Sequence, residues 1–261
     1  MKKKICAISD IHGDLINIPS CDILCISGDI LPLKIQKDHE KSIDWLMNVF
    51  YPYLLNLDCK HVIMIWGNHD FIGQKFHDFR YTGEYQSELL FGKNSKVHIL
   101  LDELIEIEGI KIYGTPWIPE LSGWAFYGPS TYLNYKFNWI PENIDILLTH
   151  CPPKFGTQGV VLQKCWNYRR DFGCIELQNI IESKKFEKDL YIISGHIHSG
   201  NHEIETNGNI KYVNVSIKDE NYEITYQPKI IEISKIYYFL WIHKLILFLE
   251  VWLLKEQMKK C

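Results

Sequence analysis

The chain has 261 residues, of which 46% are hydrophobic and 23% are charged, a balance typical of a globular protein that can bury a sizeable core. Its formal net charge of −4 gives no general attraction to nucleic acid, so no stable nucleic-acid partner is expected. The eight cysteines form no CxxC pair, which favours reduced thiols in a cytoplasmic protein over a disulfide framework or a zinc knuckle. Asp10 interrupts the first apolar run too early for a signal-peptide core.

Strands and helices are predicted to alternate through the first half of the chain. Runs of β-branched and apolar residues predict strands, and apolar residues recurring every three or four positions predict helices. In chain order, these patterns predict strands at 4–9 and 22–27, a helix at 38–55, a strand at 61–66, a helix at 84–91, a strand at 97–100 and a hairpin at 103–114.

The second half of the chain begins with a loop-like segment, 115–143, and then returns to alternating elements. The pair Asn207-Gly208 is a strong two-residue turn signal and centres a hairpin. We see no domain boundary before residue 234, so residues 1–234 are expected to form one domain. The elements predicted here are a strand at 144–148, a helix at 174–183, a strand at 190–194, the hairpin at 202–217 and short strands at 222–226 and 229–233.

Short motifs of acidic residues and histidine follow five of the predicted strands. In an open α/β sheet, the strand ends form the crevice where ligands bind, so we expect these side chains to gather there. A single histidine after a strand is usually an ordinary surface or core residue, but five such motifs at one sheet edge are not explained in that way. The motifs are Asp10-Ile11-His12, Gly28-Asp29, Gly67-Asn68-His69-Asp70, Thr149-His150 and Gly195-His196-Ile197-His198.

These motifs offer seven nitrogen and oxygen ligands without a thiolate, a set that suits manganese, iron or zinc better than calcium or copper(I). Seven ligands exceed the four of a structural zinc site. Asp29 can bridge two ions, which would then lie about 3.5–4 Å apart and clamp the oxygens of an in-line phosphoryl displacement. We therefore expect two divalent metal ions, with manganese the first choice. The candidate ligands are Asp10, His12, Asp29, Asn68, His150, His196 and His198.

His69 stands apart from the candidate ligands. It lies between Asn68, which offers an amide oxygen, and Asp70, which offers a carboxylate. A histidine beside the metals and oriented by a carboxylate is suited to protonating a leaving alkoxide. We therefore expect His69 and Asp70 to be catalytic.

The series Asp-x-His, Gly-Asp, Gly-Asn-His-Asp, Thr-His and Gly-His-x-His, spread over residues 4–233, resembles the calcineurin-like metallophosphoesterase superfamily. The resemblance implies an α/β fold, a four-layer αββα β-sandwich flanked by helices. It implies that a small phosphoester substrate is hydrolysed by a metal-bridging hydroxide, with His69 in the leaving-group role and Asp70 where the family usually has Glu or Asp. It also implies one metal site of Asp10, His12, Asp29 and His198, and a second of Asp29, Asn68, His150 and His196.

Further motifs are similar to the metallophosphoesterase-domain (MPPED-type) branch, which implies hydrolysis of phosphodiesters such as cyclic nucleotides, with phosphomonoesters the other substrate class expected. Gly28-Asp29 continues without the Asp-Arg-Gly sequence of the Ser/Thr phosphatases, so the arginine that would clamp a phosphate dianion is absent. The alternative is a non-catalytic phosphate-binding, nucleotide-binding or scaffolding module on the same fold. The branch motifs are Gly114-Thr115-Pro116-Trp117, Gly123-Trp124-Ala125-Phe126, and the segments 145–153, 173–177, 213–216 and 226–228.

The segment 235–261 lies outside the family pattern. Residues 236–254 are nearly all apolar or aromatic and predict a C-terminal apolar helix whose apolar arc is wider than docking on a small domain needs. Packing on the fold or a homodimer contact is the first interpretation. A membrane-surface contact at the periphery of the cytoplasm is the second, and a membrane span is the last, because His243, Lys244 and Glu250 interrupt the apolar run.

A chain that ends at Ser234 is expected to keep diesterase activity, because every motif precedes that residue. Its oligomeric state or membrane affinity should change, since so large an apolar surface marks an interface. Light scattering and vesicle sedimentation on the full and shortened chains measure the two outcomes. An unfolded shortened chain would show instead that the segment belongs to the core.

Overall fold

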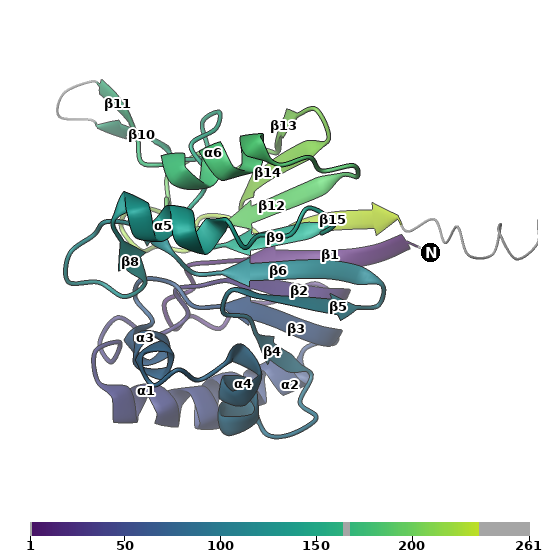
Figure 1. Ribbon diagram of the computed structural model, residues 1–261. Coiled ribbons are helices and arrows are strands. Elements are labelled where there is room, and N and C mark those ends of the chain that lie inside the picture. Colours follow the sequence, from purple (N-terminus) through teal and green to yellow (C-terminus); the bar gives the residue numbers. More distant parts are fainter. Residues whose placement is uncertain (1, 164–167, 235–261) are drawn as a thin grey trace, which may run out of the picture.

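Figure 1 shows the computed structural model, which describes residues 2–163 and 168–234. Two β-sheets lie face to face, and helices cover the outer side of each sheet (Figure 1). The four-layer αββα sandwich predicted from the sequence is therefore confirmed. The predicted C-terminal apolar helix lies outside the described residues.

The first sheet has five strands in the order β15-β1-β2-β3-β4. Strands β1 to β4 run parallel, and the last strand, β15, pairs antiparallel with β1 at the edge. The four parallel strands therefore deliver their carboxyl ends to one side of the molecule. The strands are β1 (Lys2–Ile8), β2 (Cys21–Ser27), β3 (Cys59–Ile65), β4 (Val97–Ile99) and β15 (Lys229–Ser234).

Helices cover the outer face of the first sheet, in the lower part of Figure 1. The predicted helix at 38–55 is one helical stretch with a π-helical turn inside it, and it begins where the Asp38 side chain accepts a hydrogen bond from the Lys41 backbone N–H. The helical elements are α1 (His39–Trp45), η1 (Leu46–Phe50), α2 (Tyr51–Asn56), α3 (Phe71–Asp78) and α4 (Gly83–Phe91).

The second sheet has six strands in the order β13-β14-β12-β9-β6-β5. Helices α5 (Ser130–Phe137) and α6 (Ile175–Ser183) cover its outer face, in the upper part of Figure 1. Its central strands β6, β9, β12 and β14 are parallel. The strands are β5 (Glu103–Ile107), β6 (Ile110–Thr115), β9 (Ile146–Thr149), β12 (Leu190–Ser194), β13 (Glu205–Asn207) and β14 (Ile210–Asn214).

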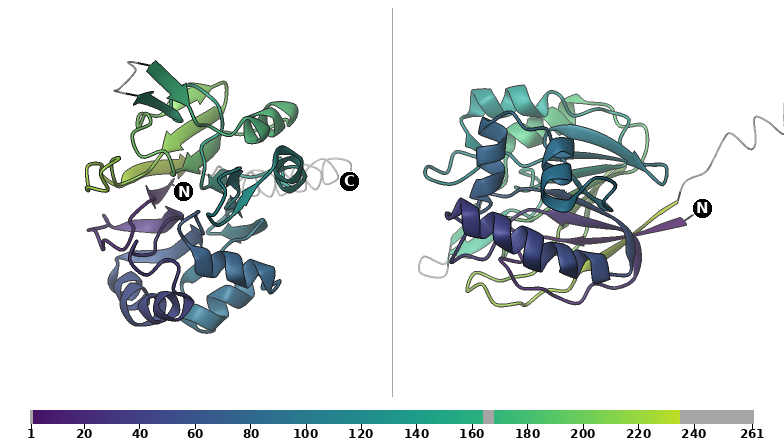
Figure 2. Two further views of the ribbon diagram at one scale, coloured as in Figure 1. Left: turned by 90° about the vertical axis from the view of Figure 1, so that its left-hand side faces the viewer. Right: turned by 90° about the horizontal axis from the view of Figure 1, so that it is seen from below.

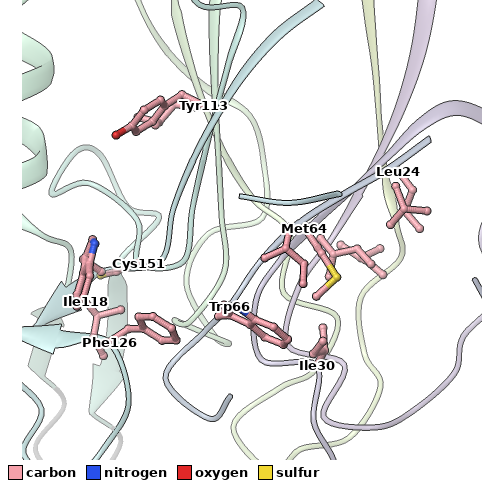
Figure 3. Close-up of a cluster of buried hydrophobic side chains, with 14 of the residues drawn as sticks. Leu24, Ile30, Met64, Trp66, Tyr113, Ile118, Phe126 and Cys151 are labelled. Atoms are coloured by element: carbon pink, nitrogen blue, oxygen red, sulfur yellow. The ribbon is translucent and has the colours of Figure 1, made fainter. Parts of the chain in front are cut away.

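Side-chain alternation along the strands builds two kinds of core. In β1, Ile5 and Ala7 face the second sheet, whereas Cys6 and Ile8 face the helices. Strands buried on both faces read as continuous apolar runs, which is why the strand predictions were reliable here. Figure 3 shows the larger cluster, in which Trp66 and Phe126 are fully buried.

Several short elements were missed by the sequence analysis. The segment 115–143 was expected to be a loop, but it contains α5 and the two-residue strands β7 (Ile118–Pro119) and β8 (Tyr127–Gly128). Helix α3 and the antiparallel pair of β10 (Val160–Gln163) and β11 (Tyr168–Asp171) were also missed. The two helices have eight residues each and the strands only two or four, so their sequences give a weak periodic signal. Residues 222–226 were predicted as a strand, but only an isolated bridge between Ile224 and Lys218 forms there.

Two negative observations concern residues 2–163 and 168–234. Their six cysteines are free and buried. None of their helices combines the length and the apolar character that a membrane span requires.

Candidate metal centre

The five sequence motifs meet at the carboxyl ends of β1, β2, β3, β9 and β12, contributed by both sheets. This edge faces the viewer in the left view of Figure 2. The proposed ligands are almost fully buried there: Asp10 and His150 have no exposed surface, and His198 is 9% exposed. Side chains separated by more than 180 positions in the chain are thus brought into contact.

Asp29 lies at the centre of this cluster. Its Oδ2 atom is 3.3 Å from Nε2 of His150 and 3.9 Å from Nε2 of both His12 and His69. The other oxygen, Oδ1, accepts a hydrogen bond of 2.7 Å from the backbone N–H of His69. One carboxylate therefore faces imidazoles contributed by three different strand ends.

Asp10 organises a second part of the cluster. Its Oδ1 atom is 3.3 Å from Nε2 of His198, and its Oδ2 atom accepts a hydrogen bond of 2.7 Å from the Ser216 hydroxyl. The backbone N–H of His196 also donates to Asp10 at 3.0 Å. The Nε2 atoms of His12 and His198 are 3.5 Å apart, so the nitrogens of both Asp-x-His and Gly-His-x-His motifs converge.

His150 links this cluster to Asn68. The Asn68 Oδ1 atom is 2.9 Å from His150 Nε2, and the His150 Nδ1 atom is 2.7 Å from the backbone carbonyl of Ser27. A carbonyl on the far nitrogen fixes the tautomer that leaves Nε2 free to bind a metal. The ring of His196 lies 5.0 Å from that of His150, at the more exposed side of the site.

The donors fit divalent cations. Three groups of three side chains hold nitrogen and oxygen atoms that all lie within 4.8 Å of one another, and Asp10, His12 and Asp29 each belong to two of these groups. Buried carboxylates and imidazole nitrogens that face one another without thiolate suit manganese, iron or zinc. The three groups are Asp10, His12 and His198; His12, Asp29 and His69; and Asp10, Asp29 and His150. His196 belongs to none of them.

Electrostatics divide the histidines into two kinds. Burial opposes a charge on His150 and His198, but the neighbouring Asp29 and Asp10 outweigh it and raise both pKa values to about 9. Burial lowers the pKa of His12 to about 4 and that of His196 to about 3. The charges of Asp29 and Asp10 thus favour the protonated forms of His150 and His198, whereas His12 and His196 are neutral at pH 7.

The backbone is strained at four of the candidate ligands. Asp10, His12, Asp29 and His196 have φ values of 56°, 44°, 54° and 66°, in the left-handed region that non-glycine residues rarely adopt. Such strain persists where the surrounding structure holds it, and it clusters at functional sites. A neighbouring glycine provides space for the Asp10 carboxylate, because a Cβ on Gly195 would lie only 2.3 Å from Asp10 Oδ2.

The expected pairing of His69 with Asp70 is wrong. Both Asp70 oxygens are taken by backbone N–H groups that follow β2 and β3, so Asp70 joins two loops and does not orient the imidazole. The His69 Nδ1 atom instead lies 2.5 Å from Oε1 of Gln36, a residue that sequence reasoning missed because no motif includes it.

A cavity of about 310 Å³ opens over the cluster. Its floor includes Asp29, Asn68, His69 and His198, and the aromatic rings of Trp124 and Tyr222 stand in its wall. Tyr222 was also missed, since its segment was predicted as a strand. A larger hollow, of about 750 Å³, lies between α4, β4 and β5 and contains no candidate ligand. The candidate ligands therefore line the smaller of these two hollows.

The fold and the convergent site define a metal-dependent phosphoesterase. The model of the calcineurin-like phosphoesterase family matches residues 3–200, and the chain belongs to this family. Its relatives place it in the metallophosphoesterase-domain (MPPED-type) branch. Over 242 residues it is 32% identical to "Metallophosphoesterase domain-containing protein 1" of Homo sapiens and of Mus musculus, covering 87% of this chain and 69% of each relative.

The chain is also similar to a phosphopantetheinyl hydrolase (PptH) from Mycobacterium tuberculosis. The structures superpose with a TM-score of 0.47 and 13% sequence identity, covering 90% of this chain and 97% of the other. The family assignment rests on the sequence matches.

Asp29→Asn is expected to weaken metal binding more than loss of any other single candidate ligand, because the Asp29 carboxylate faces three imidazoles. Mutation of a residue that only hydrogen-bonds to a metal ligand typically lowers metal affinity about 10–100-fold. Loss of a direct ligand should lower the affinity by at least that much. Asp22→Asn, on the strand that precedes Asp29 and outside the site, is the control. Elemental analysis and calorimetric titration measure the result, and an unchanged metal content would contradict the assignment.

Metal binding at pH 7 is expected to release protons. His150 and His198 have pKa values of about 9 in the metal-free protein, so both are protonated at pH 7, and an imidazole must be neutral to bind a metal. Affinity should therefore rise with pH up to about 9. Calorimetry in buffers of different ionisation enthalpy should count roughly two protons released per saturated molecule. Binding without proton release would exclude both histidines as ligands.

Proposed function

We propose that this protein is a phosphodiesterase that uses two divalent metal ions, with manganese the first choice and cyclic nucleotides the first substrates to test. The observation that carries this proposal is the position of Asp29, whose carboxylate lies between the imidazoles of His12, His69 and His150 at the floor of the cavity. A buried carboxylate in that position is suited to bridge two cations.

Two overlapping ligand sets would hold the ions. Asp10, His12, Asp29 and His198 would form one site, which agrees with the group of Asp10, His12 and His198. When bound, two divalent ions stabilise charge on phosphoryl oxygens and lower the pKa of a water molecule between them. Asp29, Asn68, His150 and His196 would form the other site, and the contact of Asn68 with His150 supports it.

His69 would act on the leaving group. Its Nε2 atom faces Asp29 at 3.9 Å, and its ring lies against Trp124 with the ring centroids 4.3 Å apart. This places the nitrogen at the cavity floor, where the phosphoester would lie. A proton carried on Nε2 would pass to the leaving oxygen as its bond to phosphorus breaks.

The cavity wall favours a diester over a phosphorylated protein side chain. Among the residues that line it in the described part of the chain there is no lysine or arginine, and Glu220 adds a carboxylate. A guanidinium fork is the usual clamp for a phosphate dianion, whereas a diester carries only one charge. Trp124, Phe172 and Tyr222 offer faces on which a nucleobase could stack.

His69→Ala is expected to lower kcat and leave the metal content unchanged. General acid catalysis is typically worth about 10²–10⁴-fold in rate, and the loss should shrink for substrates with good leaving groups. His98→Ala, in the larger hollow outside the site, is the control. If His69→Ala loses metal, as the short distance to Asp29 would allow, His69 is a ligand and the role proposed for it is wrong.

Wild-type protein loaded with manganese is expected to hydrolyse bis-(p-nitrophenyl) phosphate and cyclic nucleotides faster than p-nitrophenyl phosphate or a phosphopeptide. The reason is the absence of a cationic clamp in the cavity wall that the structure describes. Faster turnover of the phosphopeptide would refute the preference. Nucleotide binding without hydrolysis of any ester, by protein that holds metal, would favour the non-catalytic alternative.

A further inference from the structure

Gln36 lies in a loop that the fold holds beside His69. The loop follows Asp29 and folds back on Pro32, whose carbonyl accepts backbone hydrogen bonds from Ile35 and Gln36. Two residues later, Asp38 caps helix α1. The backbone on both sides of Gln36 is therefore fixed, and its half-buried side chain reaches the imidazole.

The contact of Gln36 determines which nitrogen of His69 carries hydrogen. The atom 2.5 Å from Nδ1 is the amide oxygen Oε1, and a carbonyl oxygen can only accept a hydrogen bond. Nδ1 must therefore be the donor, and the neutral ring keeps its lone pair on Nε2. That nitrogen is the one directed at Asp29 and the cavity.

The other neighbours of His69 accept no hydrogen bond from its ring, and the Asp29 Oδ2 atom, 3.9 Å from Nε2, is too far away for one. Asp70, the carboxylate next to it in sequence, is occupied by backbone donors. Trp124 contacts the face of the ring without a hydrogen bond, and the ammonium group of Lys37 lies 5.6 Å from the centre of the Trp124 ring. These contacts limit the tilt of the imidazole, but only Gln36, among the residues the structure describes, accepts a hydrogen bond from the ring.

We infer that Gln36 is the positioning residue for His69, holding Nδ1–H so that Nε2 serves the reaction at the cavity floor. The amide of Gln36 thus takes the orienting role that the sequence motif suggested for the carboxylate of Asp70. When the ring is protonated on both nitrogens, this imidazolium can give its Nε2 proton to the leaving oxygen as the bond between that oxygen and phosphorus breaks. It is left as the neutral Nδ1–H form, with Gln36 still its hydrogen-bond partner. The inference about proton transfer rests on the proposed function, whereas the tautomer does not.

The tautomer can be measured without any activity. Long-range ¹H–¹⁵N correlation spectra of the metal-free protein, with His69 assigned by the His69→Ala variant, should show the Nδ1–H form. Gln36→Leu should shift His69 toward the Nε2–H form, whereas Gln36→Glu, which keeps an acceptor, should preserve the wild-type signal. Gln227→Leu, at an exposed position, is the control. A wild-type Nε2–H form, or no change in Gln36→Leu, would overturn the inference.

The kinetic test compares leaving groups. Gln36→Leu should lower kcat by tenfold or more for a phenyl diester and by less than threefold for the corresponding p-nitrophenyl diester, estimates set below the full general-acid effect of about 10²–10⁴-fold. A merely structural role would lower both rates alike and would contradict the inference, as would failure of Gln36→Glu to restore the phenyl rate. If the wild-type protein hydrolyses neither ester, the proposed function fails while the spectra still decide the role of Gln36.

Discussion

The buried carboxylate of Asp70 holds together the two loops on which the site depends. It accepts hydrogen bonds from the backbone N–H groups of Asp29, Ile30, Leu31 and Gly67, at 2.8–3.1 Å. Hydrogen bonds to a charged group are worth about 1.5–3 kcal/mol each, and a buried N–H left without a partner costs a similar amount. Burial and the neighbouring Asp29 raise the pKa of Asp70 to about 7. Both therefore oppose the ionised carboxylate that the backbone N–H groups stabilise.

The rest of the centre is built outward from that link. With the Asp29 backbone held by Asp70 in its left-handed conformation, its carboxylate is directed toward the imidazoles. Ser27, the last residue of β2, connects the two sheets. Its hydroxyl donates a hydrogen bond to the Thr149 carbonyl, and its own carbonyl contacts His150. The site therefore lies where two sheets are joined by hydrogen bonds rather than on a flexible loop, which suits the placement of ligands.

The sequence predicted well what depends on strand ends and poorly what depends on contacts between distant segments. Strand ends are local signals, so the motifs alone were enough to assign Asp10, Asp29 and His150 to one edge of the sandwich. The partner of His69 could not be predicted, because proximity in sequence favoured Asp70, whereas the fold brings Gln36 to the ring. Tyr222, whose own φ is 62°, lines the cavity from a segment that the sequence analysis predicted as a strand.

Charge explains why the centre should accept a phosphoester only when cations are bound. Asp10 and Asp29 are buried and their pKa values lie far below the usual range, with the nearby histidines supplying the attraction that overcomes burial. Protonated His150 and His198 only balance these two charges, and the described cavity wall adds Glu220 but no lysine or arginine. An anion entering the metal-free cavity would therefore meet no net positive charge. Divalent cations would replace those protons and leave an excess of positive charge at the floor, which is the attraction that an anionic phosphoester needs.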